Sequence, residues 1–167
     1  MAEEPSPPRI FVDSSVLFAA AASSSGASRA LVLLAEIGLL RFVVSQQIFE
    51  EVERNLADTA PKALPFFVRL RQVLDWEVVD YPAPILVAEA AKHIALKDAP
   101  ILAAAMSALV ARLITLDKRH FKTEAVLNYS QLMIQTPSEL IQDIRQVLSA
   151  GISSSRGLGV ADESESQ

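Results

Sequence analysis

Acidic residues follow short apolar segments at several places in this 167-residue sequence. Asp13 ends the segment RIFVD, Asp117 ends RLITLD, and both segments have the apolar character of buried strands. Asp98 stands at the expected start of a helix, and Asp80 is expected only to end a third strand. Carboxylates that gather at one place repel one another unless a cation compensates for their charge. Because oxygen ligands suit Mg²⁺ and Mn²⁺, these residues indicate a divalent metal site, able to activate water and to neutralise a phosphate group.

The composition leaves carboxylate oxygens as the expected metal ligands. The chain has no cysteine, which excludes disulfides, thiol nucleophiles, thiolate zinc sites and iron–sulfur clusters. Its two histidines, His93 and His120, are too few for a histidine-rich site, and both are expected to be surface or packing residues. With 51% hydrophobic residues and a mean hydropathy of +0.30, the chain can bury a substantial core, which excludes a wholly disordered protein.

Three glutamates lie on the helix expected after the segment 41–45. The apolar face of this helix is centred near Val52, since successive residues on a helix are separated by about 100°. Glu51 and Glu53 therefore flank that face, while Glu50 points away from it. Helical geometry alone leaves open whether Glu51 or Glu53 belongs to the acidic site.

Short apolar runs alternate with helical patterns along the chain, and this alternation predicts the fold. The expected strands cover 9–13, 41–45, 76–80, 112–117 and 132–135. The expected helices cover 28–36, 45–56, 61–74, 85–95, 98–109 and 138–148. Such alternation is typical of an α/β three-layer sandwich, in which helices cover a central parallel sheet of four or five strands. Ligands of such sheets bind beyond the carboxyl ends of the strands, where Asp13 and Asp117 are expected.

Short sequence patterns predict where three helices begin and where one flexible connector lies. Ser28, Ser45 and Ser138 are predicted helix N-caps, because a serine hydroxyl can accept a hydrogen bond from the first turn. The segment 19–28, AAAASSSGAS, is expected to be a flexible connector.

One domain is predicted, between two loosely structured ends. Residues 1–8 are an expected disordered leader, residues 9–150 the folded domain and residues 151–167 a flexible acidic tail. The acidic, proline-rich start differs from a signal peptide, and no apolar run is long enough to span a membrane. A cytoplasmic protein without a membrane partner is therefore expected.

The net charge of −5 at first argues against a nucleic-acid partner. Five of the 20 acids, however, lie in the two end segments, so the 15 acids of residues 9–156 balance its 15 Lys and Arg. The folded part is formally neutral, and acids that bind a metal would leave the rest of its surface mildly basic. Nucleic acid is therefore permitted as a partner.

Four segments together resemble the PIN-domain family over roughly residues 9–145. They are RIFVDSSVLFAA, FVVSQQIFEEVERNL, LKDAPILAAAMSALVARLITLDKRHF and MIQTPSELI, in this order and spacing. The similarity is greatest to bacterial PIN proteins related to VapC-type toxins, which are metal-dependent ribonucleases. The resemblance implies a PIN-like fold and a site that binds Mg²⁺ or Mn²⁺.

The resemblance also implies which residues form this site. The catalytic and metal-binding acidic quartet of the family corresponds to Asp13, Glu51, Asp98 and Asp117. Glu51 is preferred to Glu53 because the family's acid directly precedes an aliphatic residue, as in FEEV. Thr115 matches the hydroxyl residue that the family usually has before its last acid, and it is included among the catalytic residues. Ser14 and Ser15 stand where the family often has Thr and Asn, and Ser15 is expected to position ligands or water.

Two positions depart from the family pattern, and three basic residues are candidates for RNA contact. Lys97 stands where many relatives carry an acid, and Arg112 stands where a small or acidic residue is common. Neither departure touches the acidic quartet. Lys118, Arg119 and Lys122 closely follow Asp117 and are candidate phosphate contacts, with Arg54 and Lys97 as the next candidates.

The expected function is that of an Mg²⁺- or Mn²⁺-dependent endoribonuclease, and the family resemblance implies that cleavage leaves a 5′-phosphate and a 3′-hydroxyl. RNA is the expected substrate, a homodimer the expected assembly, and the toxin of a toxin–antitoxin pair a further expectation, with an antitoxin protein as partner. One alternative is a PIN-fold module that binds RNA or protein without cleavage. A haloacid-dehalogenase-like phosphatase is a weaker alternative, because it needs a second Asp where this chain has Ser15.

Overall fold

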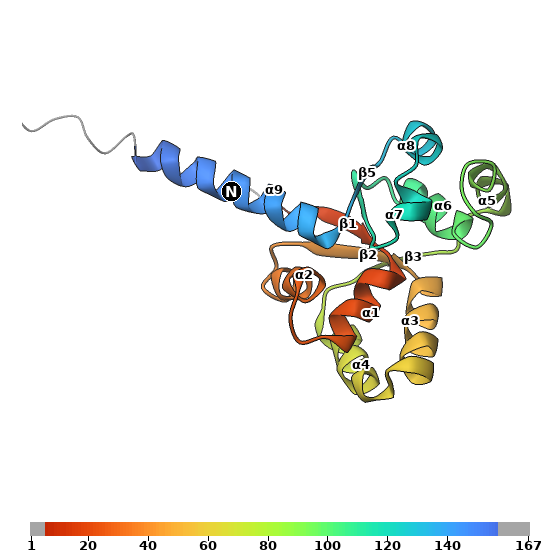
Figure 1. Ribbon diagram of the computed structural model, residues 1–167, viewed down its shortest axis with the longest axis horizontal. Coiled ribbons are helices and arrows are strands. Elements are labelled where there is room, and N and C mark those ends of the chain that lie inside the picture. Colours follow the sequence, from red (N-terminus) through yellow and green to blue (C-terminus); the bar gives the residue numbers. More distant parts are fainter. Residues whose placement is uncertain (1–5, 157–167) are drawn as a thin grey trace, which may run out of the picture.

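A five-stranded parallel sheet forms the centre of the computed structural model, which describes residues 6–156 (Figure 1). Its strands are β1 (Arg9–Val12), β2 (Arg41–Ser45), β3 (Glu77–Val79), β4 (Arg112–Ile114) and β5 (Met133–Gln135). The strand order is β3-β2-β1-β4-β5, and every neighbouring pair is parallel. This confirms the predicted α/β fold with a central parallel sheet, and the sheet has five strands where four or five were predicted.

Helices cover this sheet on both sides. They are α1 (Ser14–Ala22), α2 (Ala27–Glu36), α3 (Gln46–Thr59), α4 (Leu64–Val73), α5 (Pro84–Ala90), α6 (Ala99–Ser107), α7 (Lys118–Phe121), α8 (Glu124–Ser130) and α9 (Pro137–Arg156). A short 3-10 helix, Pro61–Ala63, precedes α4. Figure 1 shows α1 to α4 gathered on one side of the sheet and α5 to α8 on the other, while α9 leaves β5 and packs against α2. This is the layered arrangement that the alternation of strands and helices predicts.

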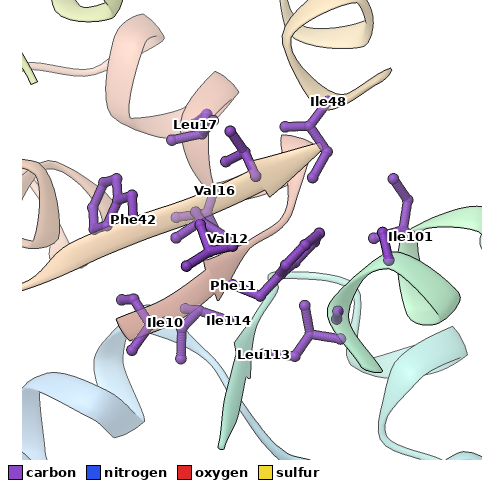
Figure 2. Packing of buried hydrophobic residues seen from close by; sticks show 14 of the residues in the cluster. Ile10, Phe11, Val12, Val16, Leu17, Phe42, Ile48, Ile101, Leu113 and Ile114 are labelled. Atoms are coloured by element: carbon purple, nitrogen blue, oxygen red, sulfur yellow. The ribbon is translucent and has the colours of Figure 1, made fainter. Parts of the chain in front are cut away.

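The central strand β1 is buried from its second residue onward. Its residues Ile10, Phe11 and Val12 are at most 1% exposed, as expected for a parallel strand packed on both faces. Phe11 pairs in register with Val43 of β2 and with Leu113 of β4. Figure 2 shows the side chains of these strands packed in one cluster with residues of α1, α3 and α6. The chain that follows β1 and β4 is therefore held at a well-packed edge of the sheet.

Helix α1 replaces most of the connector predicted for residues 19–28. Residues 19–22 complete this helix, and only 23–26 separate it from α2. The segment SSVLFAAAA lacks the one-sided apolar pattern of a surface helix because so much of it is buried, including Val16, Leu17 and Ala20. A helix without this pattern gives no periodic signal, which explains why the sequence does not reveal it.

Two of the predicted serine caps do not act as caps. Helix α2 begins at Ala27, one residue before Ser28, and follows Gly26. Gly26 has a φ of +97°, a conformation that residues with a side chain rarely adopt. Ser45 does precede α3, but its Oγ atom is buried and makes no hydrogen bond with the described residues.

Helix α9 begins one residue earlier and ends later than predicted, at Pro137 and Arg156. Thr136 and Glu139 form a reciprocal capping box in place of the predicted Ser138 cap. The Thr136 N–H donates to Glu139 Oε2 (2.8 Å), and the Glu139 N–H donates to Thr136 Oγ1 (3.2 Å). Residues 151–156 of the predicted tail are therefore helical; the rest of the tail and residues 1–5 of the predicted leader lie outside the described residues.

Within residues 6–156, no single helix is both long and apolar enough to cross a membrane. The consecutive helices α1 and α2 together reach that length and composition, but they meet at 94°.

Removing the Thr136 hydroxyl tests the observed cap of α9. Thr136→Ala should lower the free energy of unfolding by about 1 kcal/mol, since the Glu139 N–H loses its acceptor. For a domain of this size that is a fall of about 2–4 °C in Tm, measured by circular dichroism. The matched control is Ser138→Ala, because Ser138 is exposed and lies two residues after Thr136; this variant should leave Tm nearly unchanged. A larger fall in Tm for Ser138→Ala than for Thr136→Ala would show that Ser138 caps the helix, as predicted from the sequence.

Candidate active site

A cavity of about 170 Å³ opens beyond the carboxyl ends of β1 and β4. It is lined by Asp13, Ser14, Ser15, Glu51, Lys97, Asp98, Ile101, Asp117 and Phe121. The four acids of the predicted quartet are all in this lining, although more than 100 residues separate the first from the last. The fold therefore brings the predicted carboxylates into one place.

Asp13 is the most enclosed of these acids. It directly follows β1, its N–H donates to the carbonyl oxygen of Ile114 (3.0 Å), and the residue is only 6% exposed. Ser15 Oγ and Thr115 Oγ1 both donate to Asp13 Oδ2, over 2.7 Å and 2.8 Å. Two hydroxyl donors on one oxygen orient the carboxylate and stabilise its charge.

Thr115 also connects Asp13 to Asp117. This fully buried residue follows β4, and its Oγ1 atom accepts a hydrogen bond from the Asp117 N–H (3.0 Å). The Leu116 N–H donates to Ser15 Oγ (3.1 Å) and forms a second link between the same two chain segments. Both hydroxyl residues named from the sequence, Ser15 and Thr115, thus hold the ends of two central strands together.

Asp117 does not end a strand, as the sequence predicts for the segment 112–117. Strand β4 ends at Ile114, and Asp117 is instead the N-cap of α7. Its Oδ1 atom accepts a hydrogen bond from the backbone N–H of His120 (3.1 Å). The capping bond starts a helical turn, which is why the extended segment stops before the acid.

Asp98 lies at the start of α6 with an unpaired oxygen. Its Oδ2 atom is buried and makes no hydrogen bond with the residues that the structure describes. Burial is the main cause that raises the pKa of Asp98; the negative charges of Asp117 and Asp13 add to it, whereas Lys97 and His120 oppose it. A buried carboxylate without a partner costs free energy, and a cation in the cavity would supply that partner.

His120 is the residue of this site that the sequence interpretation missed. Expected to be a surface or packing residue, it places its Nδ1 atom 2.7 Å from Asp117 Oδ2 and 3.4 Å from Asp98 Oδ2. Partial burial acts to raise the pKa of Asp117, but hydrogen bonds from the ring and the backbone of His120 outweigh it and hold this pKa below its usual value. The i, i+3 spacing from Asp117 was the available signal, since such residues are neighbours on a helix.

The three glutamates of α3 have three different surroundings. Glu51 lines the cavity. Glu53 forms an ion pair with Arg71 of α4, and Glu50 accepts a hydrogen bond from the Tyr81 hydroxyl (3.1 Å). This placement selects Glu51 as the glutamate of the candidate site, where helical geometry alone left Glu53 open.

The basic residues near the cavity also separate into groups. Lys97 lines the cavity, whereas Lys118 and Arg119 are exposed on α7 outside the lining. Lys122 is held by both oxygens of Glu139, each 2.9 Å from its Nζ atom. Arg112, the other departure from the family pattern, pairs with Asp143 of α9 (3.3 Å) and bonds to Gln135. Lys122 and Arg112 therefore have structural partners.

The donor set of the cavity fits a divalent cation. Ligand atoms of Asp98, Asp117 and His120 lie within 4.8 Å of one another, and Asp13 and Glu51 line the same cavity. Carboxylate oxygens are the usual ligands of Mg²⁺ and Mn²⁺. Such an ion would bind the buried oxygen of Asp98 and reduce the electrostatic repulsion among the acids.

Comparison with protein-family profiles gives a match to the PIN domain over residues 9–119. The chain belongs to the PIN-domain family. A comparison of the sequence with curated proteins gives no significant match. The resemblance found in the sequence is therefore confirmed at the level of the family, and the cavity lies within the part of the chain that the PIN-domain profile covers, apart from Phe121.

Solved structures share this PIN fold at low sequence identity. VapBC2 from Rickettsia felis, bound to a DNA fragment from their promoter, is 14% identical with a TM-score of 0.57, covering 77% of this chain and 98% of its own. FitAcB from Neisseria gonorrhoeae is 16% identical with a TM-score of 0.54, covering 77% and 97%. VapC20 from Mycobacterium tuberculosis, described as a sarcin–ricin loop cleaving toxin, is 15% identical with a TM-score of 0.51, covering 65% and 90%. At these identities the likeness shows a common fold.

Replacing Thr115 with the equally large Val tests the link between Asp13 and Asp117. Thr115→Val should lower the free energy of unfolding by about 1–3 kcal/mol, because the Asp117 N–H loses its acceptor and Asp13 loses a donor. Urea denaturation measures this loss. Thr59→Val makes the same chemical change at an exposed helix end and should cost less than about 0.5 kcal/mol. Equal losses in the two variants would show that the Thr115 hydroxyl has no special role.

The raised pKa of Asp98 predicts a pH-dependent stability difference in the metal-free protein. Since the folded pKa lies above the unfolded one, the stability linked to this group is present at acidic pH and is lost as pH rises through the folded pKa. In the presence of a chelator, Asp98→Asn should therefore gain Tm relative to wild type between about pH 3 and pH 7. The control is Asp80→Asn, an exposed acid outside the cavity lining. A Tm difference for Asp98→Asn that does not grow with pH would contradict the raised pKa.

Proposed function

We propose that this PIN-domain protein is a metal-dependent ribonuclease that hydrolyses phosphodiester bonds of RNA with Mg²⁺ or Mn²⁺. The proposed metal-binding and catalytic acids are Asp13, Glu51, Asp98 and Asp117. The observation that carries the proposal is the meeting of these four carboxylates in one cavity, where a buried oxygen of Asp98 lacks a partner. Repelling acids held together by a fold are typical of sites that bind a cation, because burying uncompensated charge is costly.

Each residue around the cavity has a part in this proposal. When bound, a divalent ion would lower the pKa of a water molecule and stabilise the charge of the phosphate. Ser15 and Thr115 orient Asp13 through their hydrogen bonds, and the backbone and ring of His120 orient Asp117. Glu51 completes the acidic lining from α3. The proposed products are a 5′-phosphate and a 3′-hydroxyl, as the family resemblance implies.

Basic residues beside the cavity support an RNA substrate. Lys97 lines the cavity and is placed to contact a phosphate that enters it. Lys118 and Arg119 are exposed on α7, directly after Asp117, and are proposed to contact the flanking backbone. Because the folded part of the chain is formally neutral, few phosphate contacts are expected. Two contacts would give a log–log salt slope of roughly −1.4 for single-stranded RNA.

A toxin role with an antitoxin partner is proposed from the structural relatives. The VapBC2 structure pairs two proteins on DNA from their promoter, and VapC20 is described as a toxin. A homodimer and a cytoplasmic location belong to the same proposal.

Membership of the PIN-domain family removes support for a haloacid-dehalogenase-like phosphatase. The hydroxyl of Ser15, at the position where that class needs a second Asp, is hydrogen-bonded to Asp13. A PIN module that binds without cleaving is an outcome of the test below.

The decisive experiment incubates the purified chain with mixed RNA and Mn²⁺, Mg²⁺ or a chelator. Cleavage should require the metal and should fall more than about a hundredfold in Asp13→Asn, since the loss of residues that merely support metal ligands typically costs 10–100-fold. Asn keeps one oxygen that can accept the two hydroxyl bonds, so the fold should be retained. Asp58→Asn, at an exposed position of α3, is the matched control.

Three results would count against the proposal. Wild-type rates in Asp13→Asn would overturn the site. RNA binding without cleavage, at any metal concentration, would identify a binding module. Cleavage that survives the chelator would overturn the metal dependence.

A further inference from the structure

The ring of His120 lies beside Asp98 and Asp117, two of the acids proposed to hold the ion. Its Nδ1 atom is 2.7 Å from Asp117 Oδ2 and 3.4 Å from Asp98 Oδ2. We propose that His120 supplies a nitrogen ligand to the divalent ion of this site and so makes the site prefer Mn²⁺ to Mg²⁺. This inference rests on the metal-dependent function proposed above and names the ion that the site selects.

The distances among the three atoms suit neighbouring ligands of one ion. Ligands at about 2.1 Å from an ion in octahedral geometry are roughly 3.0 Å apart when they are adjacent. The two distances from His120 Nδ1 lie on either side of this value. All three ligand atoms lie within 4.8 Å of one another. Small side-chain adjustments would therefore bring them around a common ion.

The unpaired oxygen of Asp98 is a second, independent sign of a missing partner. Asp98 Oδ2 is buried, and its 3.4 Å approach to His120 Nδ1 does not have the geometry of a hydrogen bond. The ring thus satisfies Asp117 but leaves Asp98 without a partner. An ion between the three groups would satisfy Asp98 as well, with the ring proton of His120 on Nε2 and the lone pair of Nδ1 facing the ion.

The ring is not needed in this place for packing or for capping. One third of the His120 side chain is exposed, and the capping bond to Asp117 comes from the backbone N–H, which any residue provides. The cavity of about 170 Å³ also has room for an ion with several water molecules, each of which occupies about 30 Å³ in the liquid. The imidazole is therefore free to exchange its hydrogen bond with Asp117 for a bond to an ion in the cavity.

A nitrogen ligand changes which ion is favoured. Mg²⁺ is bound almost entirely through oxygen and keeps much of its water, whereas transition-metal ions accept imidazole nitrogen more readily. A purely carboxylate site would distinguish poorly between Mg²⁺ and Mn²⁺. Adding His120 to Asp98 and Asp117 should therefore strengthen Mn²⁺ binding more than Mg²⁺ binding.

The test is spectroscopic and independent of cleavage. The full chain, prepared without a histidine tag, is loaded with Mn²⁺, and pulsed electron paramagnetic resonance detects whether an imidazole ¹⁴N nucleus is coupled to the ion. His93→Asn is the matched control, because His93 is the other histidine of the chain and stacks on Tyr129, with 4.1 Å between ring centroids. Nitrogen coupling in wild type and in His93→Asn would then come from His120.

His120→Asn separates ligation from hydrogen bonding. The Asn amide can still donate to Asp117 but offers no imidazole nitrogen. We expect this variant to lose the nitrogen coupling, with the Mn²⁺ Kd rising about tenfold by calorimetry and the Mg²⁺ Kd changing less than about threefold. If His120→Asn does not fold, the spectrum of His93→Asn decides alone.

The outcomes distinguish this inference from the proposed function. Mn²⁺ bound without nitrogen coupling, or coupling that survives in His120→Asn, overturns the ligand role of His120 and leaves the metal-dependent function standing. Equal weakening of Mn²⁺ and Mg²⁺ in His120→Asn overturns the preference for Mn²⁺. A wild-type protein that binds neither ion at millimolar concentration overturns the metal-dependent function itself.

Discussion

The hydrogen bonds that Thr115 makes to Asp13 and Asp117 are the interactions on which the rest of the site depends. They join the ends of two central strands at the edge where the acids must meet. Thr115 Oγ1 donates to the Asp13 carboxylate and accepts from the Asp117 N–H, so one hydroxyl fixes the positions of both acids. Because Thr115 is fully buried just beyond the end of β4, its hydroxyl is held by the same packing that forms the core. Core packing and site geometry are thus coupled through one side chain.

Carboxylates gathered in one cavity lower the stability of the protein where they are buried without partners. Asp98 is the clearest example, since burial and neighbouring acids both disfavour its charged form. Asp13 and Asp117 avoid part of this cost through hydroxyl and imidazole donors. Asp98 Oδ2 thus has no hydrogen-bond partner among the described residues, whereas hydrogen bonds already orient the carboxylates of Asp13 and Asp117.

Much of the fold could be predicted from the sequence, because parallel strands buried on both faces leave continuous apolar runs that are easy to recognise. Helix α1 could not, because a helix buried on most sides has no polar face to mark its period. The sequence pattern also placed Asp13, Asp98 and Asp117 at chain positions that the fold brings together. The choice of Glu51 over Glu53 needed the family resemblance; in the structure Glu51 lines the cavity, whereas Glu53 pairs with Arg71 of α4, a partner distant in sequence. His120 was missed because the fold places it beside Asp98, twenty-two residues away, as well as beside Asp117.

The order of the strands has a consequence for how such a site can change. The chain adds β2 and β3 on one side of β1, and later adds β4 and β5 on the other. The direction of winding therefore reverses at β1, and the connections that leave β1 and β4 diverge there. The hollow at this reversal follows from the path of the backbone, so it persists when individual lining residues are exchanged. Changes in the surrounding connections would therefore reshape the cavity, while the backbone that positions Asp13 and Asp117 stays the same.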